Sequence, residues 1–254
     1  MQTSSVLWLD AQPSLYCFNR RLAHLLSQSR AVRQWSFQHD LDESCSVETI
    51  HHLLAESLND FEEPPNLIAH GLSGSIACLF AHRYPRLIRS LIVLSVDTLS
   101  CNHWTNHYLA MRSQLPCSRA QVLSHLSSSL LKTDQCHVNS ALSQLLERCL
   151  DSDYISGSVV GQQCIDPLTP PNVPMLILNG EHDFVVDSGS LQRWRSVLKP
   201  GDYVDLIPHG RHFFQFSHSA FAADKINAFL DLVATKEVPD SVSSLSLILS
   251  TMQS

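Results

Sequence analysis

Three short segments combine small residues with side chains that can take part in nucleophilic or acid–base chemistry. They read HGLSGS at residues 70–75, NGEHD at residues 179–183 and PHGRH at residues 208–212. A hydroxyl, a carboxylate and an imidazole are together the groups that activate a nucleophile and move its proton. The candidate chemical groups are therefore Ser73, Asp183 and His212, provided that the fold brings the three segments together.

The apolar pattern predicts that each of these segments follows a β-strand. Short apolar runs alternate with helical patterns, which is typical of βαβ units and a mostly parallel sheet. The predicted strands are residues 6–9, 35–38, 67–69, 91–95, 175–178 and 204–207. Open α/β sheets hold their sites in the loops at the carboxyl ends of parallel strands. We therefore expect the three segments to meet at that edge of the sheet.

A long interval without a strand pattern separates the fourth and fifth predicted strands. It contains a capping box, Ser118 with Gln121, and then a second helical pattern at residues 138–150, so we predict a helical insertion that acts as a lid. The chain then divides into a core at residues 1–95 and 174–236, the lid at residues 96–173 and a C-terminal tail at residues 237–254. The serine-rich tail fits either an added edge strand or a disordered end.

The composition argues against several classes of function. The 254-residue chain has a net charge of −7 and no run of Lys or Arg longer than Arg20-Arg21, so no nucleic-acid partner is expected. No apolar stretch of about 18 residues is present to span a membrane, and the N-terminus lacks a signal peptide, so we expect a cytoplasmic protein. The eight cysteines form no C-x-x-C pair, and His103 and His107 have no third ligand nearby in sequence, so we expect no metal and no other cofactor.

Glycine is scarce, and its placement is informative. The chain has 8 glycines in 254 residues, about 3%, against roughly 7% in an average protein. Glycine is then expected where no other residue fits. Half of the eight lie in the three chemical segments, namely Gly71, Gly74, Gly180 and Gly210.

Taken together, the three segments resemble the α/β-hydrolase superfamily. Residues 67–95, LIAHGLSGSIACLFAHRYPRLIRSLIVLS, are similar to its strand, nucleophile turn, helix and next strand, while NGEHD and HGRHFF are similar to its acid and histidine loops. The resemblance spans residues 6 to about 235, and LPCSR at residues 115–119 is similar to hydrolase-like proteins of cyanobacteria. It implies an α/β-hydrolase sheet without the first two family strands, in which Asp183 orients His212 and His212 is the general base.

The position of the nucleophile differs between two alignments with the family. The family serine lies fourteen positions before the proline that ends the helix, which from Pro85 is Gly71. The other alignment takes GLSGS as the turn and makes Ser73 the nucleophile. Because the turn residue has a positive φ, glycine there removes strain of about 1–3 kcal/mol. We favour Gly71 at the turn, which makes Ser73 an N-cap of the following helix.

The family's oxyanion site is also altered. The resemblance implies that the backbone amides of Leu72 and Gln12 would hold the oxyanion. The loop after the first strand, however, reads Asp10-Ala11-Gln12 where the family has His-Gly. A carboxylate at Asp10 would oppose a developing negative charge.

Three functions remain open at this point. In the first, Ser73 attacks a small, mostly apolar ester or amide, His212 takes the proton of Ser73, and Asp183 holds His212. In the second, His212 and Asp183 carry out acid–base chemistry without a covalent step. In the third, the protein is a non-catalytic binding or scaffold protein because Gly71 stands where the nucleophile belongs. All three place a small molecule under the lid, and the uncovered edge strand at residues 35–38 favours a homodimer or an edge capped by the tail.

Overall fold

Six parallel strands form a single twisted sheet. The computed structural model describes residues 5–38, 46–99, 102–131, 136–153 and 167–236. Within them the strand order is β2-β1-β3-β4-β5-β6, with every neighbouring pair parallel. The strands are β1 Val6–Asp10, β2 Val32–Ser36, β3 Asn66–His70, β4 Ser90–Leu94, β5 Met175–Gly180 and β6 Tyr203–Ile207. All six predicted strands are present, which confirms the α/β class and the parallel sheet.

The bounds predicted for β2 lie too far toward the C-terminus. The apolar run at residues 35–38 marks only its end, and pairing with β1 begins at Val32. This strand lies at the edge of the sheet, as predicted, and Arg33 and Gln34 are exposed. An edge strand forms through its backbone hydrogen bonds to one neighbour, so hydrophobic pattern alone does not mark its bounds.

Helices cover both faces of the sheet. Successive side chains of a strand point to opposite faces, and in β1 Leu7 and Leu9 join one hydrophobic cluster while Val6 and Trp8 join another. The first cluster includes residues of α2 Val47–Leu58, α3 Gly71–Arg83 and α8 Ser190–Arg195, and the second includes residues of α1 Arg20–Ser27 and α10 Ser219–Lys236. This two-faced burial makes the strands read as continuous apolar runs.

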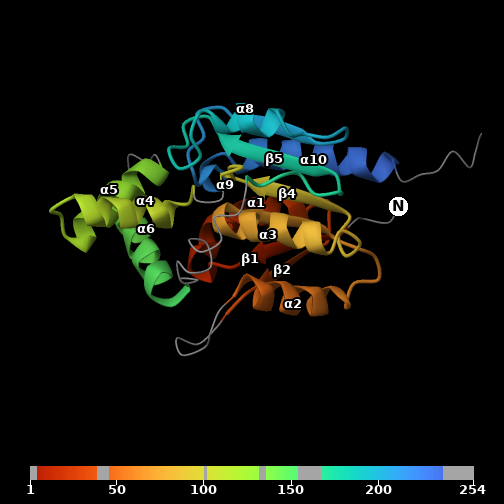
Figure 1. Cartoon of the computed structure of the whole chain (residues 1–254), viewed down its shortest axis with the longest axis horizontal. Helices are drawn as coiled ribbons and strands as arrows, with labels where there is room; N and C mark the ends of the chain where they lie inside the picture. The colour runs from red at the N-terminus through yellow and green to blue at the C-terminus, as the bar shows by residue number, and fades with distance from the viewer. Residues whose placement is uncertain (1–4, 39–45, 100–101, 132–135, 154–166, 237–254) are drawn as a thin grey trace, which may run out of the picture.

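The predicted insertion is helical where the structure describes it. Between β4 and β5 the described residues form α4 Trp104–Gln114, α5 Arg119–Leu130, α6 Cys136–Arg148 and a π-helical turn at Cys149–Asp153, and they contain no strand. The predicted capping box at the start of α5 is present. Figure 1 shows α4, α5 and α6 gathered at one end of the molecule. The C-terminal tail lies outside the described residues.

The insertion packs against the core next to the segment that carries His212. A third hydrophobic cluster joins Leu126 and Leu130 of α5 to Phe18, which ends the 3-10 helix Pro13–Phe18, and to Phe213. The Phe213 amide donates to the carbonyl of Leu130 at 3.2 Å. No helix among the described residues is long and apolar enough to cross a membrane.

Gly180 permits the loops after β5 and β6 to come into contact. A Cβ at this position would lie 2.5 Å from the carbonyl oxygen of Gly210 and 2.7 Å from that of Arg211. The amides of Glu181 and His182 donate across the same contact, to Ile207 and Gly210. Because backbone atoms would have to shift to admit a methyl group, only glycine fits here.

We expect Gly180→Ala to lower the free energy of unfolding by about 1–3 kcal/mol, the range for overpacking a rigid site. Urea denaturation measures the loss. Gly189→Ala is the matched control, because its methyl group would meet side-chain atoms of Arg193 and Asp187, which can move away. Equal losses in the two variants would contradict the proposed role of the close backbone contact.

Candidate functional site

His212 and Asp183 form a buried hydrogen-bonded pair at the carboxyl edge of the sheet. Nδ1 of His212 lies 2.9 Å from Oδ2 of Asp183, and the two side chains are 1% and 0% exposed. The other carboxylate oxygen of Asp183 accepts hydrogen bonds from the amides of Val185 and Val186. With Asp183 ionised, Nδ1 carries the hydrogen of the neutral imidazole and Nε2 is left as an acceptor.

The surroundings of Asp183 keep it ionised. Burial by itself raises the pKa of this carboxyl, but the neighbouring His212 and the amides of Val185 and Val186 bring the pKa below its ordinary value. Interactions that favour the charged form therefore exceed the desolvation of the carboxylate. A buried carboxylate held in this way fixes the orientation and tautomer of the imidazole beside it.

Gly71 lies at the turn between β3 and α3 and faces the free side of this imidazole. Its φ is +53°, in the left-handed region. A Cβ built on Gly71 would be 3.6 Å from Nε2 of His212, with ordinary van der Waals contacts. Within the described residues, this nitrogen is buried and has no hydrogen-bond partner. The turn thus has the geometry of a nucleophile elbow, but the residue at its apex has no side chain.

Ser73 is held by a different partner. It lies in the first turn of α3, buried, and its Oγ accepts a hydrogen bond from the Ala11 amide at 2.9 Å. The helix begins at Gly71 and its N-cap is His70, so the prediction of Ser73 as the N-cap is wrong. The structure brings Gly71, Asp183 and His212 together, and it uses the Ser73 hydroxyl to tie α3 to the loop after β1.

A carboxylate occupies the loop that the sequence analysis assigned to the oxyanion. The Gln12 amide donates to Oδ1 of Asp10 at 3.0 Å and is therefore engaged. The Leu72 amide lies in the first turn of α3, where backbone N–H groups have no partner within the helix. Asp10 is 4% exposed, and its Oδ2 has no hydrogen-bond partner among the described residues.

The buried position of Asp10 makes this carboxyl a weak acid. Burial raises its pKa to about 7, with the Gln12 amide opposing the shift and the charge of Asp153 adding to it. Asp10 and Ser73 line a small cavity of about 10 Å³, close to the least space that holds one water molecule. The remaining lining residues are Leu9, Gln12, Leu15, Asn19, His70 and Phe213.

His70 belongs to the site, although the sequence analysis did not single it out. Its Nε2 lies 2.9 Å from the carbonyl oxygen of His212, and its ring stacks on Phe213 with centroids 5.2 Å apart. Burial, together with the neighbouring His212, lowers the pKa of His70 to about 3. A neutral His70 therefore positions the backbone of His212. The only signal in the sequence is its place directly before the turn glycine.

Two other polar groups near the site have structural roles. Asp97, in the loop after β4, accepts two hydrogen bonds from the guanidinium of Arg193, at 3.0 and 2.5 Å. Cys78, on α3, is buried, and burial raises the pKa of its thiol to about 12. Neither side chain is free to act as a nucleophile or as a second acid.

Comparisons with known proteins agree on the fold. No protein-family model matches the chain. It is 33% identical to the uncharacterised protein alr2406 of Nostoc sp. over 89% of the chain and 90% of that protein. It is 31% identical to the uncharacterised protein sll0249 of Synechocystis sp., over 95% and 96% of the two chains. The solved structure of an enol-lactonase from Burkholderia xenovorans LB400 is similar with a TM-score of 0.68 at 13% identity, covering 91% of this chain and 92% of that one.

The raised pKa of Asp10 predicts a specific pH dependence of stability. The folded state holds this proton up to about pH 7, whereas the unfolded chain releases it near 3.8. The stabilisation is complete below pH 3.8 and is lost as the pH rises through 7. Relative to Asp10→Asn, the wild type should therefore lose on the order of 4 kcal/mol of unfolding free energy between pH 4 and pH 8. Urea denaturation at several pH values measures this difference, and parallel curves for the two proteins would contradict it.

Proposed function

The chain belongs to the α/β-hydrolase superfamily, in one family with alr2406 and sll0249, and we propose that it binds a small molecule at the His212–Asp183 pair without hydrolysing it. One observation carries the proposal. Gly71, at φ +53°, holds the place beside Nε2 of His212 from which a nucleophilic side chain would act. A glycine has no atom that can attack an ester or amide.

The contacts of Ser73 argue against its taking over that role. To act as the nucleophile, its hydroxyl would need to lie within hydrogen-bond reach of His212. Its Oγ instead accepts the Ala11 amide inside the core, and a movement toward His212 would leave that buried amide without a partner. Leaving a buried donor unsatisfied costs about 1–3 kcal/mol.

The loop after β1 is equally unfavourable for hydrolysis. Acyl transfer places a negative charge on the former carbonyl oxygen, and the loss of one donor to that oxygen costs roughly 10²–10³ in rate. Here the Gln12 amide is bound to Asp10, and above about pH 7 the ionised carboxylate of Asp10 would repel the oxyanion. The site therefore lacks a nucleophile and has lost a stabiliser of the intermediate that the nucleophile would form.

The unpaired nitrogen of His212 suggests what the site binds. A buried acceptor without a partner is unfavourable, and a ligand that donates one hydrogen bond to Nε2 would relieve that cost. Phe213, whose ring contacts the imidazole of His212 with centroids 5.3 Å apart, belongs to the third hydrophobic cluster together with Val185 and residues of the insertion. A small, mostly apolar molecule with one hydroxyl or amide donor fits these requirements.

A second function, acid–base chemistry by His212, is favoured by the same nitrogen. Nε2 of a neutral imidazole backed by an ionised carboxylate can take a proton from a bound molecule, with no covalent intermediate. In that case His212→Ala would bind the molecule but no longer convert it. Equal conversion by wild type and His212→Ala would rule this function out.

Labelling with a fluorophosphonate, followed by peptide mass spectrometry, tests the proposal. We expect no label on the wild type or on Ser73→Ala, because no side-chain hydroxyl of the described residues is bonded to Nε2 of His212. Gly71→Ser should gain a label at position 71, and Gly71→Ser with His212→Ala should lose it. At pH 8, where Asp10 is ionised, adding Asp10→Asn to Gly71→Ser should speed labelling by roughly tenfold or more, since it removes a charge that opposes the oxyanion.

The Ser73→Ala protein is the control that separates the two alignments. Label on Ser73 of the folded wild type, absent from Ser73→Ala, would contradict the proposal and restore the serine-hydrolase function. Circular dichroism and urea denaturation establish that each variant is folded before it is assayed.

A further inference from the structure

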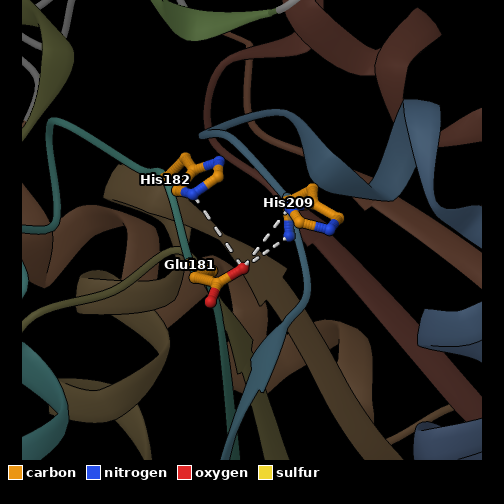
Figure 2. A group of neighbouring side chains, drawn as sticks. All are labelled: Glu181, His182 and His209. Carbon is orange, nitrogen blue, oxygen red and sulfur yellow. Dashed lines mark hydrogen bonds and ion pairs between the residues drawn. The ribbon is translucent and has the colours of Figure 1, made fainter.

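A second cluster of chemical side chains lies on the same two loops, outside the His212–Asp183 pair. Glu181 and His182 follow β5, and His209 follows β6. Figure 2 shows the carboxylate of Glu181 with the two imidazole rings on either side of it. Oε2 of Glu181 is 3.7 Å from Nδ1 of His209 and 4.0 Å from Nε2 of His182. One ligand atom from each residue lies within 4.8 Å of the others.

The backbone holds the two loops in register for this cluster. The His182 amide donates to the Gly210 carbonyl at 2.8 Å, and the His209 amide donates to Oε2 of Glu181 at 2.9 Å. His209 has a φ of +57°, one of two non-glycine residues with positive φ in the described chain. A non-glycine residue in this conformation carries strain that the surrounding structure must hold, and such strain gathers at functional sites.

No cation from the protein neutralises Glu181 within the described residues. Its ion pairs there are with His182 and His209, both of which carry charge only when protonated. The nearby Arg211 is directed to the insertion, where its guanidinium donates to the carbonyls of Ser128 and Ser129. An exposed carboxylate between two imidazoles presents three potential ligand atoms to solvent.

We propose that Glu181, His182 and His209 bind Zn²⁺ and thereby clasp the acid loop to the histidine loop. Two imidazoles and one carboxylate, with water in the fourth position, are a common zinc ligand set. Tetrahedral zinc places its ligand atoms about 3.3 Å apart, since each lies about 2.0–2.2 Å from the metal. The two nitrogens lie 3.7 and 4.0 Å from the Glu181 oxygen and all three atoms lie within 4.8 Å of one another, so rotation of these exposed side chains has to bring them closer together.

The location gives the metal a structural consequence. Asp183 follows Glu181 by two residues, and His212 follows His209 by three. Zinc would therefore bridge the two loops that hold the buried pair, at the solvent side of the contact that Gly180 permits. Binding to the folded state alone raises its stability by mass action.

Isothermal titration of the full-length protein, free of any histidine tag and dialysed against chelator, with ZnCl₂ tests the site. We expect one binding event, weakened at least about tenfold in His182→Ala and in His209→Asn. Asparagine is chosen at position 209 because it tolerates a positive φ, so the loop should keep its conformation. Zinc should also raise the Tm of the wild type and leave the Tm of His209→Asn unchanged.

His52→Ala is the matched control. His52 is exposed and pairs with Glu56 at 3.2 Å on α2. This pair is distant in sequence from the two loops and offers only two ligands. Its loss should leave zinc affinity unchanged. An affinity that survives both loop substitutions, or that falls equally in His52→Ala, would overturn the proposal. Because the readout is metal binding and thermal stability, the result is independent of whether the protein hydrolyses esters.

Discussion

The buried hydrogen bond between His212 and Asp183 is the interaction around which the carboxyl edge of the sheet is arranged. A carboxylate removed from water is tolerable only where charge and hydrogen bonds compensate it, and Asp183 receives two backbone amides as well as the imidazole. To bring these groups together, the loops after β5 and β6 must touch, and Gly180 is the residue that lets them. His70 then fixes the backbone of His212 through its carbonyl oxygen. The protein thus maintains this buried pair although, in the part of the chain that the structure describes, no hydroxyl is bonded to Nε2 of His212.

The changes at the nucleophile and at the oxyanion loop are consistent with each other. Gly71 adopts a positive φ without the strain that a serine would carry there, and it brings no side chain to the turn. Asp10 becomes acceptable in the loop after β1 once no oxyanion has to form, and the Gln12 amide binds it. Ser73 has a structural role, because its hydroxyl accepts a hydrogen bond from the Ala11 amide and so links α3 to the loop after β1. All three contacts fit the proposal that this site binds a molecule without hydrolysing it.

Much of this arrangement could be predicted from the sequence, and the rest depended on contacts across the fold. The strands flanking the site are short apolar runs that alternate with helical patterns, and the place of Gly71 before Pro85 indicated a turn glycine. By contrast, the predicted bounds of the edge strand β2 were displaced, because its polar residues form the strand by pairing with β1. Neither the role of His70 nor the cluster of Glu181, His182 and His209 could be found in one segment, since each requires a neighbouring loop. The raised pKa of Asp10 follows from burial, which sequence alone does not measure.

We propose that the place beside Nε2 of His212 belongs to a bound molecule and not to a side chain of the protein. A crystal structure at high resolution measures this directly, through the partner of that nitrogen and the partner of Oγ of Ser73. We predict that Oγ of Ser73 accepts its hydrogen bond from the Ala11 amide, and that the atom within hydrogen-bond distance of Nε2 of His212 belongs to water or a ligand. A hydrogen bond between Oγ of Ser73 and Nε2 of His212 would contradict it.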